Sequence, residues 1–207
     1  MPDTELMIDG PADGTTVVLA HGAGAAMDSD WMGDVSAALA ARGLRVVRFE
    51  FPYMQRRRED GKRRGPDRPP VLLATWRAVI GALAGVDRLV IGGKSMGGRI
   101  ASMVAEECGA DGLVCMGYPF HPPHAPEKLR TAHLQQLRTP TLILQGMRDP
   151  FGGADEAAGY GLAQTIRIHW LEDGDHSFKP RLKSGRTLEQ NMAEAVNELV
   201  RFVGALP

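Results

Sequence analysis

The chain has 207 residues, of which 24 are Lys or Arg and 25 are Asp or Glu, so its formal net charge at pH 7 is −1. This balance argues against a strongly basic nucleic-acid-binding surface, and no apolar run approaches the roughly 20 residues of a membrane-spanning helix. Cys108 and Cys115 lie in apolar surroundings, which argues against a disulfide framework or a cysteine metal site. The length predicts one domain over residues 1–207, and the acidic N-terminus, which lacks a signal-peptide pattern, predicts a cytoplasmic protein.

Short apolar runs alternate with helical patterns along the chain. The apolar runs predict strands at 16–20, 45–49, 89–92, 112–116, 141–145 and 166–171. Apolar residues at three- and four-residue spacing predict helices at about 31–42, 71–83, 96–107, 154–162 and 188–203. Because the strands are almost continuously apolar and alternate with helices, the pattern predicts a compact, doubly wound α/β fold with a mostly parallel sheet.

Three segments follow neither pattern, namely 52–70, 119–140 and 146–153. Each of them comes directly after a predicted strand, so all three are expected at the carboxyl edge of the sheet. Ligands of open α/β sheets bind at that edge. Chemically active residues are therefore expected in and beside these segments.

Residues 93–97 match the pattern G-x-S-x-G and lie between a predicted strand and a predicted helix. A serine at such a turn is presented at a helix N-terminus, and this context is that of a nucleophile elbow. The Gly-Lys-Ser within the stretch is also similar to the end of a phosphate-binding loop. That motif requires a glycine where Arg88 stands, so the nucleotide-binding interpretation is rejected and Ser95 is predicted as a nucleophile.

A serine hydroxyl is a weak nucleophile until a neighbouring base accepts its proton, and histidine has a suitable pKa. His176 comes directly after the last predicted strand, and Asp149 comes after the strand before it. An acid in that place orients the imidazole, so we predict a triad of Ser95, Asp149 and His176. The alternatives are a solvated loop histidine and a turn-forming aspartate before Pro150.

Stabilising an oxyanion requires two backbone N–H donors. One is expected from Met96, the residue after the serine. The other is expected from Ala23, in the small-residue loop 21–25 that follows the first predicted strand. His21 in the same loop is expected to support the loop rather than to act as the base.

The candidates for contact with a substrate are His21, Tyr53, Lys94, Tyr118 and Phe120. The aromatic residues among them either line a pocket or simply close the top of the core. The basic loop 56–68, together with Lys94, either guides an anionic substrate or is a solvated segment.

Histidines also stand at positions 121, 124 and 133, on the proline-rich segment 119–140. They lack metal-ligand spacing with carboxylates or thiols. We therefore expect no metal and no other cofactor.

These motifs together resemble one branch of the α/β-hydrolases over almost the whole chain. The matching stretches are 21–25, 48–54, 92–99, 117–123, 145–152 and 174–178. The order of Ser95, Asp149 and His176 is also the order found in that superfamily. The branch includes bacterial dienelactone-hydrolase-like proteins, a vertebrate testis-expressed protein and a subunit of the non-specific-lethal histone acetyltransferase complex. The resemblance implies an α/β-hydrolase fold, and the chain is too short for a large cap domain.

We therefore expect a serine hydrolase that cleaves a small-molecule ester, lactone or thioester through an acyl-enzyme. Two alternatives stay open. One is a non-catalytic binding or scaffold protein with a protein partner, since one relative is a complex subunit. The other is acyl transfer to an alcohol or amine, which the same triad can perform.

Overall fold

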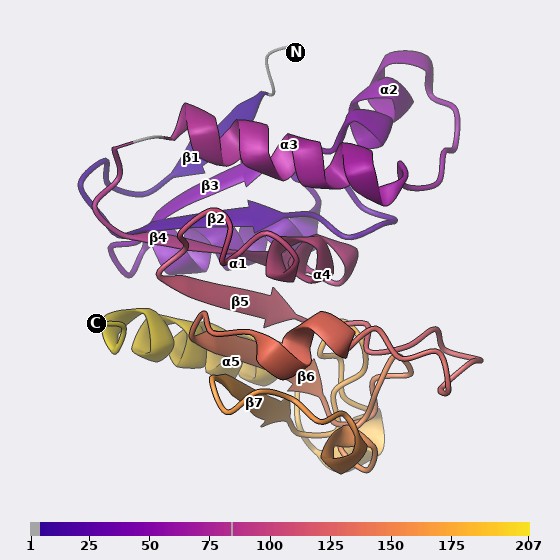
Figure 1. Cartoon of the computed structure of the whole chain (residues 1–207). Helices are drawn as coiled ribbons and strands as arrows, with labels where there is room; N and C mark the ends of the chain where they lie inside the picture. Colours follow the sequence, from indigo (N-terminus) through magenta and orange to yellow (C-terminus); the bar gives the residue numbers. More distant parts are fainter. Residues whose placement is uncertain (1–4, 84) are drawn as a thin grey trace.

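The computed structural model describes residues 5–83 and 85–207, and within them a seven-stranded sheet carries helices on both faces (Figure 1). The strands are β1 (Leu6–Asp9), β2 (Thr16–Ala20), β3 (Arg45–Phe49), β4 (Leu89–Lys94), β5 (Gly112–Met116), β6 (Thr141–Gly146) and β7 (Ile166–Leu171). Their order across the sheet is β1-β3-β2-β4-β5-β6-β7, and β1 is antiparallel to β3 while the other neighbours are parallel. The predicted mostly parallel α/β architecture is confirmed.

Two separate apolar layers hold the helices on the sheet. On one face, α1 (Asp30–Ala40) and α5 (Leu188–Gly204) bury side chains such as Leu39 and Leu199. On the other face, α2 (Pro52–Asp60), α3 (Pro69–Ala82) and α4 (Met96–Ser102) bury theirs, among them the fully enclosed Trp76. Burying one large apolar side chain stabilises the fold by about 1.5–3 kcal/mol, so both layers contribute substantially.

The helix predictions needed three corrections. The predicted helix 154–162 was wrong, because only a short 3-10 turn at Ala157–Gly159 forms there, and Gly161 has a left-handed φ of 59°. The helix predicted over 96–107 ends at Ser102, where hydrogen bonds tighten to three-residue spacing. The segment 52–70, predicted to be irregular, contains α2.

Local features explain why α2 forms despite its charged sequence. Pro52 occupies its first turn, and Gly61 ends it with a left-handed φ of 69°. Both choices are favourable at those helix positions. Its apolar contribution is confined to Tyr53 and Met54, so hydrophobic periodicity gives no signal for it. No helix among the described residues is both long enough and apolar enough to cross a membrane.

The sheet topology places two loops side by side. Strands β2 and β4 are parallel neighbours, and the register pairs Ala20 with Gly93 near their carboxyl ends. After β2 the chain forms β3 on one side of β2 and then crosses over to form β4 on the other side. The strand order therefore reverses between β2 and β4, and such a topological switch point is where α/β sheets bind ligands. The loop after β2 and the turn after β4 therefore meet at one edge.

Candidate active site

The turn after β4 presents Ser95 in a strained backbone conformation. Ser95 has φ 52° and ψ −116°, a combination that non-glycine residues rarely adopt, and its N–H donates to the Met116 carbonyl at 2.9 Å. Strain of this kind is retained where the surrounding structure imposes it, and it clusters at functional sites. The turn therefore has the form of the predicted elbow.

Close packing explains the glycines on both sides of Ser95. A Cβ atom added to Gly93, which has φ +154°, would lie 2.2 Å from the Ala20 carbonyl oxygen. A Cβ added to Gly97 would lie 2.4 Å from the same oxygen and 2.6 Å from that of His21. Only glycine lets α4 approach β2 this closely, so the pattern G-x-S-x-G has a steric cause here.

The structure brings the three residues of the predicted triad together. The Ser95 hydroxyl donates to His176 Nε2, with Oγ and Nε2 2.9 Å apart. The His176 Nδ1–H donates to Asp149 Oδ2 at 2.8 Å. This chain of two hydrogen bonds leaves Nε2 as an acceptor, which is the tautomer that a general base requires.

Asp149 is held by more than the histidine. It is 2% exposed, and its Oδ1 accepts from the Phe151 N–H at 2.9 Å. Its Oδ2 also accepts from Gln145 Nε2 at 3.0 Å, while the Gln145 Oε1 accepts from the Tyr118 N–H at 2.7 Å. Gln145 is a functional candidate that the sequence analysis missed, since a glutamine at the end of an apolar strand has no motif of its own.

The loop after β2 is fixed from behind by His21 and Tyr53. The Phe51 N–H donates to His21 Nε2 at 3.1 Å, so Nδ1 carries the proton and donates to the Gly22 carbonyl at 2.7 Å. Burial lowers the pKa of His21 and favours this neutral form. His21 therefore contacts the loop from behind and does not lie among the residues that line the cavity at Ser95.

The Tyr53 hydroxyl points at the same loop. It donates to the carbonyls of Gly22 and Ala23 at 3.2 and 3.0 Å. Burial raises the pKa of Tyr53, so the hydroxyl stays protonated at neutral pH and keeps its donor role. Tyr53 is fully buried, and its contacts are with the loop backbone.

A cavity of about 360 Å³ opens beside Ser95. Its lining is Gly22, Ala23, Gly24, Ala25, Ser29, Trp31, Met32, Lys94, Ser95, Phe151, His176 and Ser177. The rings of Phe151 and His176 are 4.4 Å apart between centroids. Among the described residues, the N–H groups of Ala23 and Met96 donate to no protein acceptor. The cavity thus combines apolar walls, a hydroxyl, an imidazole and two free N–H donors.

Two aromatic candidates lie elsewhere. Tyr118 and Phe120 are fully buried and do not line this cavity. The Tyr118 hydroxyl donates to the Arg130 carbonyl at 3.0 Å, and Phe120 stacks on Tyr160 at 4.3 Å. Both residues close the top of the core, which was the second of the two interpretations for them.

Three arginines of the basic segment 56–68 are paired with neighbouring carboxylates. Arg56 pairs with Asp67 at 2.5 Å, and Arg64 pairs with Asp60 at 2.5 Å. Arg58 bonds to the buried Glu50 at 2.6 Å and to Asp28 as well. These pairs tie α2 to the segments around it, and they weaken the hypothesis of electrostatic guidance.

Two of the three histidines of segment 119–140 have ordinary hydrogen-bond partners. His121 Nε2 lies 2.9 Å from Glu156 Oε2, and His133 Nε2 lies 2.8 Å from the Ser102 hydroxyl. Within residues 5–83 and 85–207, no group of three or more His, Cys, Asp or Glu side chains is placed to hold a metal ion.

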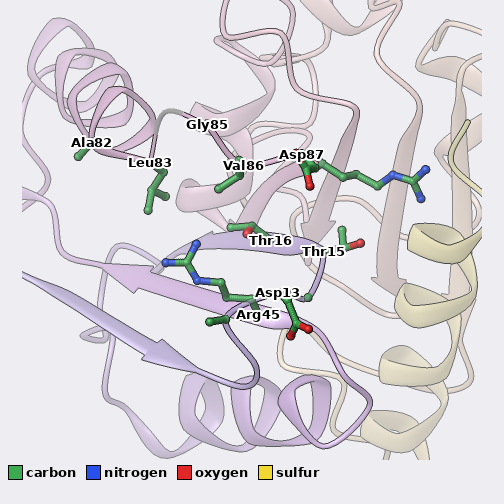
Figure 2. Close-up of a pocket in the computed structure, with 12 residues that line it drawn as sticks. Asp13, Thr15, Thr16, Arg45, Ala82, Leu83, Gly85, Val86 and Asp87 are labelled. Carbon is green, nitrogen blue, oxygen red and sulfur yellow. The ribbon is translucent and has the colours of Figure 1, made fainter.

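A second hollow, of about 420 Å³, lies at the opposite edge of the sheet (Figure 2). It is bounded by the starts of β2 and β3 and by the end of α3, with Thr16, Arg45 and Leu83 among its lining residues. None of the residues that line it is a serine, cysteine or histidine. It is therefore separate from the chemistry assembled around Ser95.

Comparison with known proteins identifies the family of the chain. Residues 13–204 match the family described as alpha/beta hydrolase domain. A serine hydrolase homologue from Coxiella burnetii is 22% identical, with a TM-score of 0.71 over 95% of this chain and 91% of that one. A serine hydrolase without a lid from Xanthomonas campestris is 19% identical, with a TM-score of 0.69 over 99% and 91%.

A third solved structure is Est1E from Butyrivibrio proteoclasticus with ferulic acid bound. It is 13% identical, with a TM-score of 0.70 over 97% of this chain and 96% of that one. At such identities the likeness shows the fold alone. The family match covers almost the whole chain, and the protein therefore belongs to the alpha/beta hydrolase family.

Proposed function

We propose that this protein is a serine hydrolase that cleaves a small-molecule ester, lactone or thioester, with Ser95, His176 and Asp149 as its catalytic triad. One observation carries the proposal: the unbroken chain of hydrogen bonds from Ser95 Oγ through His176 to Asp149, of 2.9 and 2.8 Å, at the edge of an apolar cavity. The family itself and its serine hydrolase neighbours support the same reaction class.

The mechanism follows from these contacts. His176 Nε2 takes the proton of Ser95 as Oγ attacks the carbonyl carbon, and Asp149 stabilises the imidazolium that forms. His176 then gives that proton to the leaving group, which departs and leaves Ser95 acylated. A water molecule attacks the acyl-enzyme in the same way, and its hydrolysis returns Ser95 and His176 to their starting forms.

The negative oxygen of the tetrahedral intermediate needs two donors, which we assign to the N–H groups of Ala23 and Met96. Loop 21–25 lies close enough for this role, since a Cβ added to Gly22 would be 3.7 Å from the Cβ of Ser95. Met96 starts α4, so the helix dipole also favours the developing charge.

The cavity supports a small, uncharged substrate best. Its volume is at the low end of ligand sites, and its walls include Trp31, Met32 and Phe151. The pairing of Arg56, Arg58 and Arg64 with carboxylates weakens the case for an anionic substrate. The neighbour Est1E holds ferulic acid, so esters of aromatic acids belong in the substrate panel beside short aliphatic ones.

The motifs also lead us to place the chain in the dienelactone-hydrolase-like branch. Members of one branch have more similar local motifs than members of the whole superfamily have. This finer placement does not identify the substrate.

A fluorophosphonate probe tests the proposed function directly. The probe phosphonylates a serine only where a base and oxyanion donors activate it, so we expect labelling of the native protein and none after heat denaturation. Peptide mass spectrometry should find the adduct on Ser95. Absence of labelling, or an adduct on another serine, would reject Ser95 as an activated nucleophile and favour a non-catalytic role.

Replacing Tyr53 by Phe is expected to lower kcat by about tenfold. This is less than the ~100- to 1,000-fold cost of deleting an oxyanion donor, because the loop is loosened and not removed. The loss arises since the hydroxyl orients the Gly22 and Ala23 carbonyls, and hence the Ala23 N–H. Steady-state kinetics on a neutral ester measure it.

Tyr160→Phe is the matched control for that experiment. Among the described residues, the Tyr160 hydroxyl makes no hydrogen bond although it is buried. The control should keep kcat near the wild-type value. Equal kcat in the Tyr53 variant and the wild type would show that the oxyanion loop does not depend on Tyr53.

A further inference from the structure

Lys94 is a buried cation directly before Ser95, and the triad mechanism does not use it. It is 9% exposed and ends β4. Its Nζ lies over the ring of Trp31 at 5.2 Å and over that of Phe178 at 5.6 Å. Among the described residues, no carboxylate pairs with it within 4.0 Å. Burying a cation without a direct counter-ion costs free energy, so some contact must explain its place.

That contact is with the backbone of His176. The Lys94 ammonium donates to the His176 carbonyl oxygen. Within the described part of the chain, no other donor reaches this carbonyl, and the His176 N–H has no protein acceptor. Lys94 is thus the only hydrogen-bond partner of the His176 main chain among the described residues. The turn around it is closed by the bonds from the Asp175 N–H to the Lys179 carbonyl and from the Phe178 N–H to the Asp175 carbonyl.

The space around this contact is shaped to admit it. Gly117, with φ +67°, lies beside the ammonium, and a Cβ there would be 2.7 Å from Nζ and 2.8 Å from the His176 carbonyl oxygen. Any larger residue at position 117 would force the two groups apart. Burial lowers the pKa of Lys94 to about 8, and the carboxylates of Asp149 and Asp175 oppose that shift.

We propose that Lys94 is a positioning residue, which tethers the His176 backbone to the strand end that carries Ser95 and so sets the distance between base and nucleophile. This role differs from the substrate-binding role expected from sequence, and it rests on the proposed function of the triad. Because Lys94 and Ser95 are adjacent, one strand end fixes both partners of the proton transfer.

Lys94→Met tests the tether. Methionine keeps an apolar stem between Trp31 and Phe178 but has no donor. We expect kcat on a neutral ester to fall by about 100-fold, the cost of a misplacement of about 1 Å, with KM unchanged. The rate of fluorophosphonate labelling should fall by the same factor. Lys179→Met, an exposed lysine of the same loop, is the control and should behave as wild type.

A second variant, Lys94→Gln, keeps an N–H donor without charge and should retain more activity than Lys94→Met. If the methionine variant does not fold, the glutamine variant alone tests the tether. The tether predicts equal losses of kcat on neutral and anionic esters. Wild-type kcat in both variants, or a rise in KM confined to anionic esters, would overturn the proposal.

The resonance of the His176 Nδ1 proton separates this proposal from the proposed function. The proton bonds to Asp149 in the wild type, and loss of the tether should shift and broaden its NMR signal even in a protein without turnover. An unchanged signal in a folded Lys94→Met variant would reject the tether. Absence of labelling in the wild type would instead reject the catalytic role of Ser95.

Discussion

Ser95→Ala should lower kcat by about a million-fold on any substrate that the wild type hydrolyses. Removing the nucleophile of a Ser-His-Asp triad has that order of effect, and the residual rate comes from the oxyanion donors and substrate binding. KM should change little, because the cavity walls are untouched. Burst kinetics of p-nitrophenol release from an activated ester would measure the loss.

The variant should fold like the wild type. Alanine is smaller than serine, and the strained φ of 52° is imposed by the packing around the turn. Ser184→Ala, in the turn Leu182–Ser184, is a suitable control with normal kinetics. Activity of Ser95→Ala within tenfold of the wild type would show that another residue carries the reaction.

Asp149→Asn should lower kcat by about ten thousand-fold, the effect of this change in a serine protease triad. Both oxygens of Asp149 accept hydrogen bonds, Oδ1 from the Phe151 N–H and Oδ2 from Gln145 and His176. In either orientation of the asparagine side chain, its amide nitrogen, itself a donor, would face another hydrogen-bond donor. If it faces His176, the imidazole proton moves to Nε2, and the base can no longer accept from Ser95.

Gln145 cannot relieve this conflict by turning over. Its Oε1 is engaged by the Tyr118 N–H at 2.7 Å, so its amide nitrogen stays toward position 149. Steady-state kinetics measure the loss, and Asp155→Asn, an exposed neighbour, is the matched control. If Asp149→Asn retained more than a tenth of wild-type kcat, Asp149 would not be the orienting acid.

The sequence predicted those parts of the fold in which apolar residues follow one another closely. All six predicted strands are present. Five of them are runs of mostly buried residues that pair on both sides, and β7, which is only partly buried, closes an edge of the sheet. Strand β1 was missed because it is only four residues long and pairs on one side. Helix α2 was missed because terminal residues and ion pairs favour it, and hydrophobic periodicity reports neither.

Some residues of the candidate site could likewise be predicted from the sequence, and others could not. Ser95, Asp149 and His176 were found because each follows a strand, and parallel topology brings such positions to one edge. The contacts of Gln145 and Lys94 were not predictable, because they depend on side-chain directions across loops that are far apart in sequence. The Lys94 contact, for example, spans 82 positions.

The paired arginines of the basic segment 56–68 have a kinetic consequence. Charges that attract a ligand from a distance speed its arrival most at low ionic strength, and added salt suppresses that gain. Arg56 and Arg58 on α2, and Arg64 shortly after it, are each paired with nearby carboxylates, which reduces the field that they exert at long range. The second-order rate constant for an anionic ester should therefore depend only weakly on ionic strength.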